Sequence, residues 1–244
     1  MQSISNKYKV KFIKNKTLVI SGKGDSPLWD NAEILDQFVS PWNSETIPEI
    51  KFRSLWDGTT LFFCFTVFDS LVHINKKDDT VYSINESDRV ELFFRKNENL
   101  NPYYCLEIDA SARIMDFKAH PNKEFDFNWN WPENGLEVQS FISDDYFTVE
   151  GAISIDSLKE LDLVQNGRIE TGIFRAKYSK KEGKNGYEPT WITWINPNTN
   201  SPNFHISDSF GVLLLMSKTD EDDECTIETI STTEANRIFA EIVK

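Results

Sequence analysis

The chain consists of short stretches of alternating or continuous apolar residues, separated by clusters of Asn, Asp, Gly, Pro and Ser. The segment "TLFFCFTVFD" (60–69) is apolar on both sides, which is typical of a central strand. Further strands are predicted over 86–94, 103–109, 146–155, 169–178 and 211–216. Only "SIDSLKELDL" (154–163) has the spacing of a short helix. The pattern favours an all-β fold, an antiparallel β-sandwich, over alternating strand–helix units.

The 244 residues suffice for one large domain, which we place at 1–216. The end of the chain differs, because "DEDDE" (220–224) is a solvated acidic run of the kind found in linkers. After it, Ser231 and Glu234 stand in capping-box spacing before a small apolar stripe. We therefore predict an acidic linker and a short C-terminal helix over 217–244, which either docks on the sandwich or meets a partner.

Charge and hydropathy narrow the classes of partner. The net charge is −13 and the chain has no dense Lys/Arg patch, so nucleic acid and anionic membrane are poor partners. No apolar segment is long enough to span a membrane. The first 16 residues do not resemble a signal peptide, which leaves a cytoplasmic protein and a secreted or periplasmic protein with a trimmed leader both open. No feature of the sequence indicates an oligomeric state.

The cysteines, Cys64, Cys105 and Cys225, are odd in number and form no CxxC pair. Their spacing predicts free thiols, two of them within strands.

One predicted strand, in "ESDRVELFF" (86–94), mixes charge and aromatic residues on one face. Val90, Leu92 and Phe94 alternate toward the core, so Arg89 and Glu91 point the other way. By the same alternation, the outer side also receives Glu107, Glu150 and Arg175. Sugars need such a surface, because aromatic rings cover their C–H faces and charged groups bind their hydroxyls. A solvated ladder of ion pairs is the alternative interpretation.

Five segments then occur in a familiar order: "ISGKGDSPLWDNAEIL", "KFRSLWDGTTLFFCFTVFD", "SDRVELFF", "FTVEGAISIDSL" and "WITWINP" followed by "DSFGVLLL". Over roughly residues 17–216 this order resembles the family 9 carbohydrate-binding modules and the wider DOMON-like sandwich superfamily. The resemblance implies non-catalytic binding of an oligosaccharide or polysaccharide. In that family two Trp sandwich a terminal sugar ring, and carboxylate, Arg and amide groups bind its hydroxyls.

Carried over by position, the Glu of the family's D-x-V-E motif is Glu91 and the neighbouring acid is Asp88. The chain departs from the family pattern at the aromatic positions. Tyr82 is the only aromatic residue just before the motif, and Phe204 and His205 occupy the later loop. Glu107 stands where the family places an Arg. The ligand of this chain is therefore expected to differ from cellulose or xylan ends, and a charged or branched glycan is an equal alternative.

The predicted carbohydrate site takes in residues from several predicted strands and loops. Trp191 and Trp194 lie three apart on a strand and point to opposite faces, and we assign Trp194 to the site and Trp191 to the core. The run "FDFNWNWP" (125–132) is either an edge strand or a loop over the site. The full predicted set is Tyr82, Arg89, Glu91, Glu107, Trp131, Arg175, Trp194, Phe204 and His205.

Catalysis is the main alternative function. A glycan-active hydrolase would need two carboxylates flanking the bond, and Glu91, Glu107 and Glu150 are the candidates. Against this, Arg89 and Arg175 are expected to keep such carboxylates ionised, which suits binding more than acid catalysis.

The sequence supports a cofactor site less well than it supports glycan binding or glycan hydrolysis. A DOMON-type haem site would use Met115 with His120 or His205. A structural Ca²⁺ would use the pair at 78–79, or Asp25 and Asp30. The three His have no zinc-site spacing, and we expect no other cofactor.

Overall fold

The computed structural model describes residues 5–14, 18–43, 46–181, 183 and 186–217. The predicted C-terminal helix and almost all of the predicted linker lie outside these residues. Within them, no helix combines the length and apolar character needed to cross a membrane.

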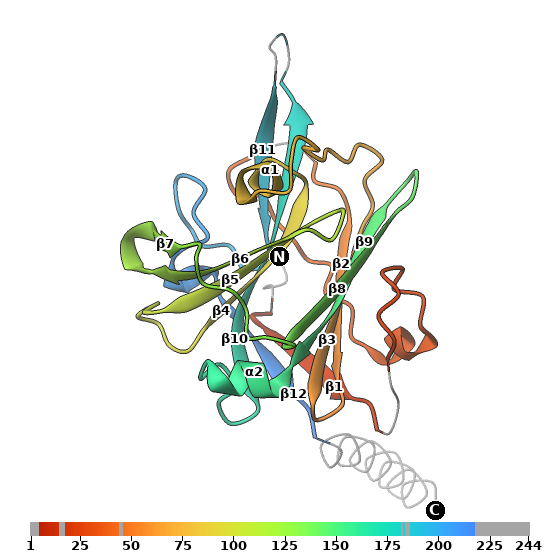
Figure 1. The fold of residues 1–244 in the computed structure, drawn as a ribbon, viewed down its shortest axis with the longest axis vertical. Coiled ribbons are helices and arrows are strands. Elements are labelled where there is room, and N and C mark those ends of the chain that lie inside the picture. Colours follow the sequence, from red (N-terminus) through yellow and green to blue (C-terminus); the bar gives the residue numbers. More distant parts are fainter. Residues whose placement is uncertain (1–4, 15–17, 44–45, 182, 184–185, 218–244) are drawn as a thin grey trace, which may run out of the picture.

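Twelve strands in the described part of the chain form one continuous, curled sheet (Figure 1). Their order across the sheet is β7-β6-β5-β4-β10-β12-β1-β2-β3-β9-β8, and β11 pairs with β10. The strands are β1 (Lys7–Phe12), β2 (Ile50–Trp56), β3 (Thr60–Val67), β4 (Arg89–Arg95), β5 (Tyr103–Asp109), β6 (Ile114–His120), β7 (Glu124–Asp126), β8 (Leu136–Ile142), β9 (Phe147–Ser154), β10 (Arg168–Lys180), β11 (Tyr187–Thr193) and β12 (Gly211–Leu215). The helical elements are η1 (Pro27–Asn31), α1 (Val81–Asn85), η2 (Pro121–Lys123), α2 (Ile155–Glu160) and η3 (Ser207–Ser209).

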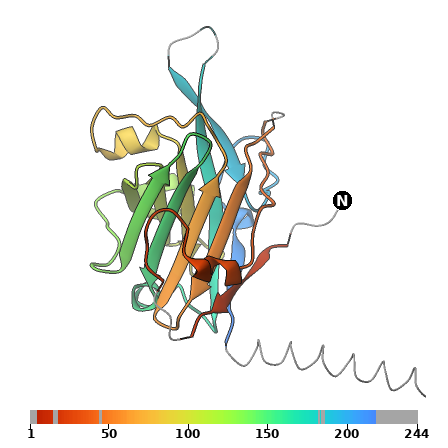
Figure 2. The ribbon, with the colours of Figure 1, turned by 90° about the vertical axis from the view of Figure 1, so that its right-hand side faces the viewer.

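The sheet folds over on itself into two layers, which the two views in Figures 1 and 2 show from different sides. Layer A comprises β7, β6, β5, β4, β10, β11 and β12, and layer B comprises β2, β3, β9 and β8. Strand β1 joins them, since it pairs in parallel with β12 through residues 7–10 and with β2 through residues 11–12. The prediction of a β-sandwich is confirmed, with these two parallel pairings as the departure from a purely antiparallel arrangement.

The central core fills the space between the layers. Val90, Leu92 and Phe94 of β4 meet Phe63 and Val149 of layer B there, as the alternation of β4 predicts. Burial at about 25 cal/mol per Å² of apolar surface makes this core the main stabilising element.

Layer A is also covered on its other face, which explains the odd composition of β4. Phe93 and Phe174 belong to a second apolar group, the outer cluster, so β4 and β5 are buried along their whole length. The outer cluster comprises Ile84, Phe93, Leu100, Tyr103, Cys105, Met115, Phe117, Ala119, Phe174, Phe204 and Phe210. Charged residues on this face of β4 are therefore buried among aromatic rings and do not form a solvated ladder.

Several local predictions are confirmed. Helix α2 begins where Ser154 caps it, with the Ser154 hydroxyl accepting hydrogen bonds from the backbone N–H groups of Asp156 and Ser157. Cys64 and Cys105 are buried free thiols, and Cys225 lies outside the described residues.

Candidate functional site

The site begins with a cross-strand pair. Strands β4 and β5 run antiparallel, and their register places Glu91 directly opposite Glu107. Both side chains lie on the outer face of layer A, away from the central core. Glu91 is 1% exposed and Glu107 is 4% exposed, so two carboxylates are held side by side in a buried position.

Arg89 joins the two carboxylates. Its Nε donates to Glu107 Oε2 at 2.5 Å, and its Nη1 donates to the carbonyl oxygen of Asn85 at 2.7 Å. Glu91 Oε1 lies 3.1 Å from the same Nε. Because Nε carries one hydrogen, which is directed at Glu107, Glu91 Oε1 is attracted to Arg89 but receives no hydrogen bond.

Burial and charge change the acidity of this cluster. Desolvation, followed by repulsion from Glu107, raises the pKa of Glu91 to about 8 although Arg89 opposes the shift. The pKa of Glu107 is raised by burial as well, against the pull of Arg89. Arg89 keeps its charge, because Glu107 and Glu91 outweigh the effect of its burial and raise its pKa. The expectation that arginines keep these carboxylates ionised is wrong for Glu91, because one guanidinium faces two buried acids.

A pocket of about 380 Å³ opens above this cluster, and aromatic side chains form most of its walls. Tyr82 comes from α1, Trp191 from β11, and Phe204 and His205 from the loop after β11. The complete lining is Val81, Tyr82, Asn85, Arg89, Glu91, Glu107, Met115, Phe117, Phe125, Phe127, Trp191, Phe204 and His205. A charged floor under aromatic walls is the combination that sugars bind.

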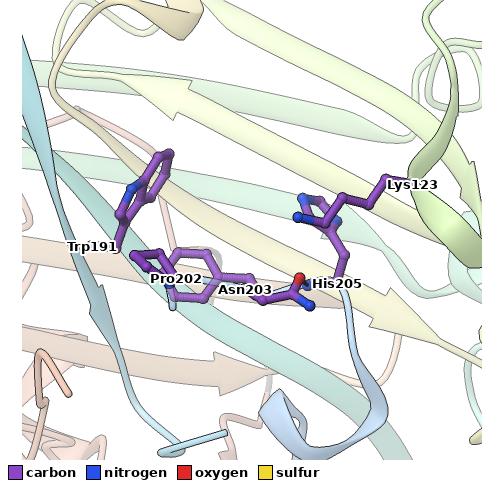
Figure 3. Close-up of a pocket in the computed structure, with 6 residues that line it drawn as sticks. Lys123, Trp191, Pro202, Asn203 and His205 are labelled. Atoms are coloured by element: carbon purple, nitrogen blue, oxygen red, sulfur yellow. Dashed lines mark hydrogen bonds between the residues drawn. The ribbon is translucent and has the colours of Figure 1, made fainter. Parts of the chain in front are cut away.

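A smaller hollow of about 150 Å³ adjoins the pocket and shares Trp191, Phe204 and His205 with it. Figure 3 shows the indole of Trp191 on one side and Lys123 and His205 on the other, with Pro202 and Asn203 between them. The hollow extends the pocket and brings one exposed cation, Lys123, to its rim.

His205 is held neutral at this junction. Its ring stacks on Phe93 with centroids 5.1 Å apart, and its Nδ1 lies 2.9 Å from the hydroxyl of Tyr103. Burial, followed by the charges of Lys123 and Arg89, lowers the pKa of His205 to about 4. His205 can thus offer hydrogen bonds at neutral pH without adding charge.

Six of the predicted site residues come together in the pocket: Tyr82, Arg89, Glu91, Glu107, Phe204 and His205. Three do not, and each belongs instead to the interior between the layers.

Trp194 and Trp131 are part of the central core. Trp194 is fully buried and donates from Nε1 to the carbonyl oxygen of Ser5 at 3.1 Å. Trp131 packs edge-on against Phe94. The two residues of "WITWINP" do point to opposite faces, but Trp191 is the one in the pocket, so our choice of Trp194 was wrong.

Arg175 also faces inward, because it pairs with Val90 across β4 and β10 and so shares the core-facing side. Its Nη2 donates to Asp69 at 2.5 Å. Glu150 lies in layer B, where Oε1 accepts from the indole of Trp29 at 2.7 Å. The predicted row of five charges on one face is therefore wrong: only Arg89, Glu91 and Glu107 share it.

The pocket also uses residues that were not assigned to it from the sequence. Phe125 and Phe127 alternate in "FDFNWNWP", and this run was recognised as a potential surface over the site. The segment begins as an edge strand and continues as a loop, because β7 ends at Asp126 and a loop follows through Trp131. Met115 and Phe117 also line the pocket from alternate positions on β6, and no sequence pattern distinguishes them from ordinary core residues.

The residues considered for cofactors are dispersed. Met115 and His205 line the pocket, whereas His120 binds Asn101 through Nδ1 at 2.8 Å and does not line it. Asp78 Oδ1 accepts hydrogen bonds from the side chains of Thr80 and Ser83. Across the described ranges, no group of three or more His, Cys, Asp or Glu residues is arranged to hold a metal ion.

Comparison with known families matches residues 20–218 to the carbohydrate family 9 binding domain-like family. The chain belongs to this family. No match was found among curated proteins.

Solved structures with the same fold were found at low sequence identity, and three of them are informative. A protein of Bacteroides uniformis proposed to bind carbohydrate is 15% identical, with a TM-score of 0.64 over 86% of this chain and 99% of that one. A family 9 module of Caldicellulosiruptor kristjanssonii in complex with glucose is 17% identical, with a TM-score of 0.56 over 88% of this chain and 97% of that one. A family 9 module of the same organism in complex with cellotriose is 16% identical, with a TM-score of 0.54 over 88% of this chain and 95% of that one.

Proposed function

We propose that this family 9 domain binds a glycan in the pocket above Glu91 and Glu107, without cleaving it. One observation carries the proposal: a buried carboxylate oxygen of Glu91 without a hydrogen bond lies at the floor of an aromatic-walled pocket. A buried acceptor without a donor costs stability of roughly 1–3 kcal/mol, so its retention is explained if a ligand supplies the donor.

A sugar ring suits both parts of the pocket. Its C–H face can pack on Trp191 or Tyr82, and its hydroxyls can donate to Glu91 and Glu107. The relatives in complex with glucose and cellotriose support a glycan as the ligand class.

The arrangement of acids favours binding over hydrolysis. A glycosidase places its two carboxylates on either side of the scissile bond, one as acid and one as base or nucleophile. Here Glu91 and Glu107 lie side by side on one floor and are attracted to one nitrogen of Arg89. Glu150, the third candidate, accepts hydrogen bonds from Trp29 and from the backbone of Gly22 in layer B.

The test is a glycan-array screen of the purified chain, with product analysis of each positive glycan after overnight incubation. Tyr82→Ala removes an exposed wall of the pocket, and Phe68→Ala removes an exposed aromatic residue that directly follows β3 in layer B. We expect the first variant to lose array binding and the second to keep it. New products would point to catalysis, and equal binding by both variants would place the glycan elsewhere.

A further inference from the structure

The floor of the pocket has an uneven number of ionisable groups. Two buried carboxylates, Glu91 and Glu107, face a single guanidinium, Arg89. When both acids are ionised, one negative charge is left without a buried partner. Such a charge is costly in a low-dielectric site unless a cation approaches it.

The other titratable groups around the cluster do not supply that cation. Tyr178 on β10 and Cys105 on β5 ionise only to anions, and burial raises their pKa values, so they stay neutral and add no further negative charge. His205 is neutral as well, because its pKa lies at about 4. Lys123 carries a charge, but it is exposed and lines only the adjoining hollow.

The hydrogen-bond pattern independently indicates that the protein leaves Glu91 without a partner. Glu91 lines the pocket, is almost completely buried, and has an oxygen without any donor. Arg89 is already committed to Glu107 and to the carbonyl oxygen of Asn85. The ligand must therefore bring a hydrogen-bond donor, and the charge balance favours a donor that is positive.

Building on the proposed glycan site, we propose that the pocket prefers an amino sugar, with its protonated amine placed against Glu91 and Glu107. An ammonium group carries one positive charge and three N–H donors, so it can serve both carboxylates at once. A hydroxyl brings one donor and no charge. The surrounding rings of Trp191, Phe204 and Phe127 add attraction for a cation that a neutral sugar does not receive.

The test compares three β-1,4-linked trisaccharides, made of glucose, of glucosamine and of N-acetylglucosamine. They share a backbone and differ only in a hydroxyl, an amine or an amide at one carbon of each ring. Titration calorimetry on the full chain at pH 6.5 is expected to give at least tenfold tighter binding of the glucosamine trisaccharide than of the other two. The measurement is repeated near 1 M salt, because the net charge of −13 attracts any cation and salt screens exposed charges.

Glu91→Gln keeps the shape of the side chain and removes its ability to ionise when the ammonium binds. We expect it to bind the glucosamine and glucose trisaccharides within about twofold of each other, and Glu107→Gln to do the same. Glu133→Gln, at an exposed acid on the loop before β8, should keep the full preference. Wild-type binding in two buffers of different ionisation enthalpy should also show proton release with the amine only, because the ammonium favours ionised Glu91.

Four results would overturn the inference. Equal affinity for the glucose and glucosamine trisaccharides contradicts it and leaves the glycan site intact, as does a preference that persists in both Gln variants or disappears at high salt. Binding of none of the three contradicts the proposed function together with the inference.

Discussion

Arg89 donates its only Nε hydrogen to Glu107 and leaves Glu91 Oε1, 3.1 Å from the same nitrogen, without a hydrogen bond. The pair of acids opposite each other on β4 and β5 is thus only half satisfied by the protein. This imbalance is the feature on which the proposed function and several measurable properties depend.

Glu91 should make stability fall as the pH rises above neutral. Its folded pKa, about 8, is above the ordinary value of 4.5, so the folded state holds a proton that the unfolded state has lost. Stability from this group is complete below pH 4.5 and decreases as the pH rises through 8. Between pH 6.5 and 8, thermal melts of wild type should show a Tm that falls relative to that of Glu91→Gln, and His205 contributes equally to both profiles.

Glu133→Gln is the matched control for that experiment, because Glu133 is exposed. It should retain the wild-type pH dependence. A Glu91→Gln profile parallel to wild type would show that Glu91 is ionised throughout.

Arg89→Ala should be severely destabilising, because it leaves two buried carboxylates without a cation. Removing one partner of a buried ion pair costs about 3–5 kcal/mol, and Arg89 is only 2% exposed. Urea unfolding measures the loss. The double variant Arg89→Ala, Glu107→Gln should recover part of it, and a double variant that is additive would contradict the coupling between the two residues.

Substitutions of Trp191 and Trp194 should have different effects, one on glycan binding and the other on stability. Trp194→Ala removes a fully buried residue of the central core and should cost about 3–5 kcal/mol of unfolding free energy. Trp191→Ala removes a partly exposed pocket wall and should weaken glycan binding with a much smaller change in stability. Denaturant unfolding and calorimetry on both variants check this, and the reverse pattern would restore Trp194 to the site.

His205 should remain neutral well below pH 6. With a folded pKa of about 4 against an ordinary 6.5, its contribution to stability is present above 6.5 and is lost as the pH falls through 4. A carbon-detected NMR titration of the imidazole should find its midpoint near 4. A midpoint above 6 would mean that the ring is hydrated and not enclosed by Phe93 and Tyr103.

The sandwich was predictable because strands of this fold keep their alternation. Val90, Leu92 and Phe94 of β4 contact the central core as their period of two requires, and the short helix α2 lies within 154–163 as expected. The joining role of β1 was not visible, because a parallel pairing between distant segments leaves no local mark on residues 7–12.

The sequence predicted the positions of the two acids of the candidate site better than those of its aromatic walls. Alternation places Glu91 and Glu107 correctly because each strand is regular, but it does not decide which layer a strand joins, and so Glu150 was assigned to the wrong face. Arg175 was misplaced because an arginine is not expected on a core-facing position, where Asp69 binds it. Which of Trp191 and Trp194 faces inward depends on the pairing of β11 with β10, which the sequence does not specify.

The burial of Glu91 also changes what a simple substitution would report. If Glu91 were an exposed side chain, Glu91→Ala would weaken sugar binding and leave thermal stability almost unchanged. Glu91 is 1% exposed, so truncation leaves a space beneath the pocket, and the isosteric Glu91→Gln is the sharper probe.

The most direct test of the central claim is a co-crystal structure with the glycan that binds most tightly on the array. The account predicts a sugar ring in the pocket, packed on Trp191 or Tyr82, with a donor group within hydrogen-bond distance of Glu91 or Glu107. A ring bound on the outer face of layer B, or in the pocket with both carboxylates untouched, would contradict it.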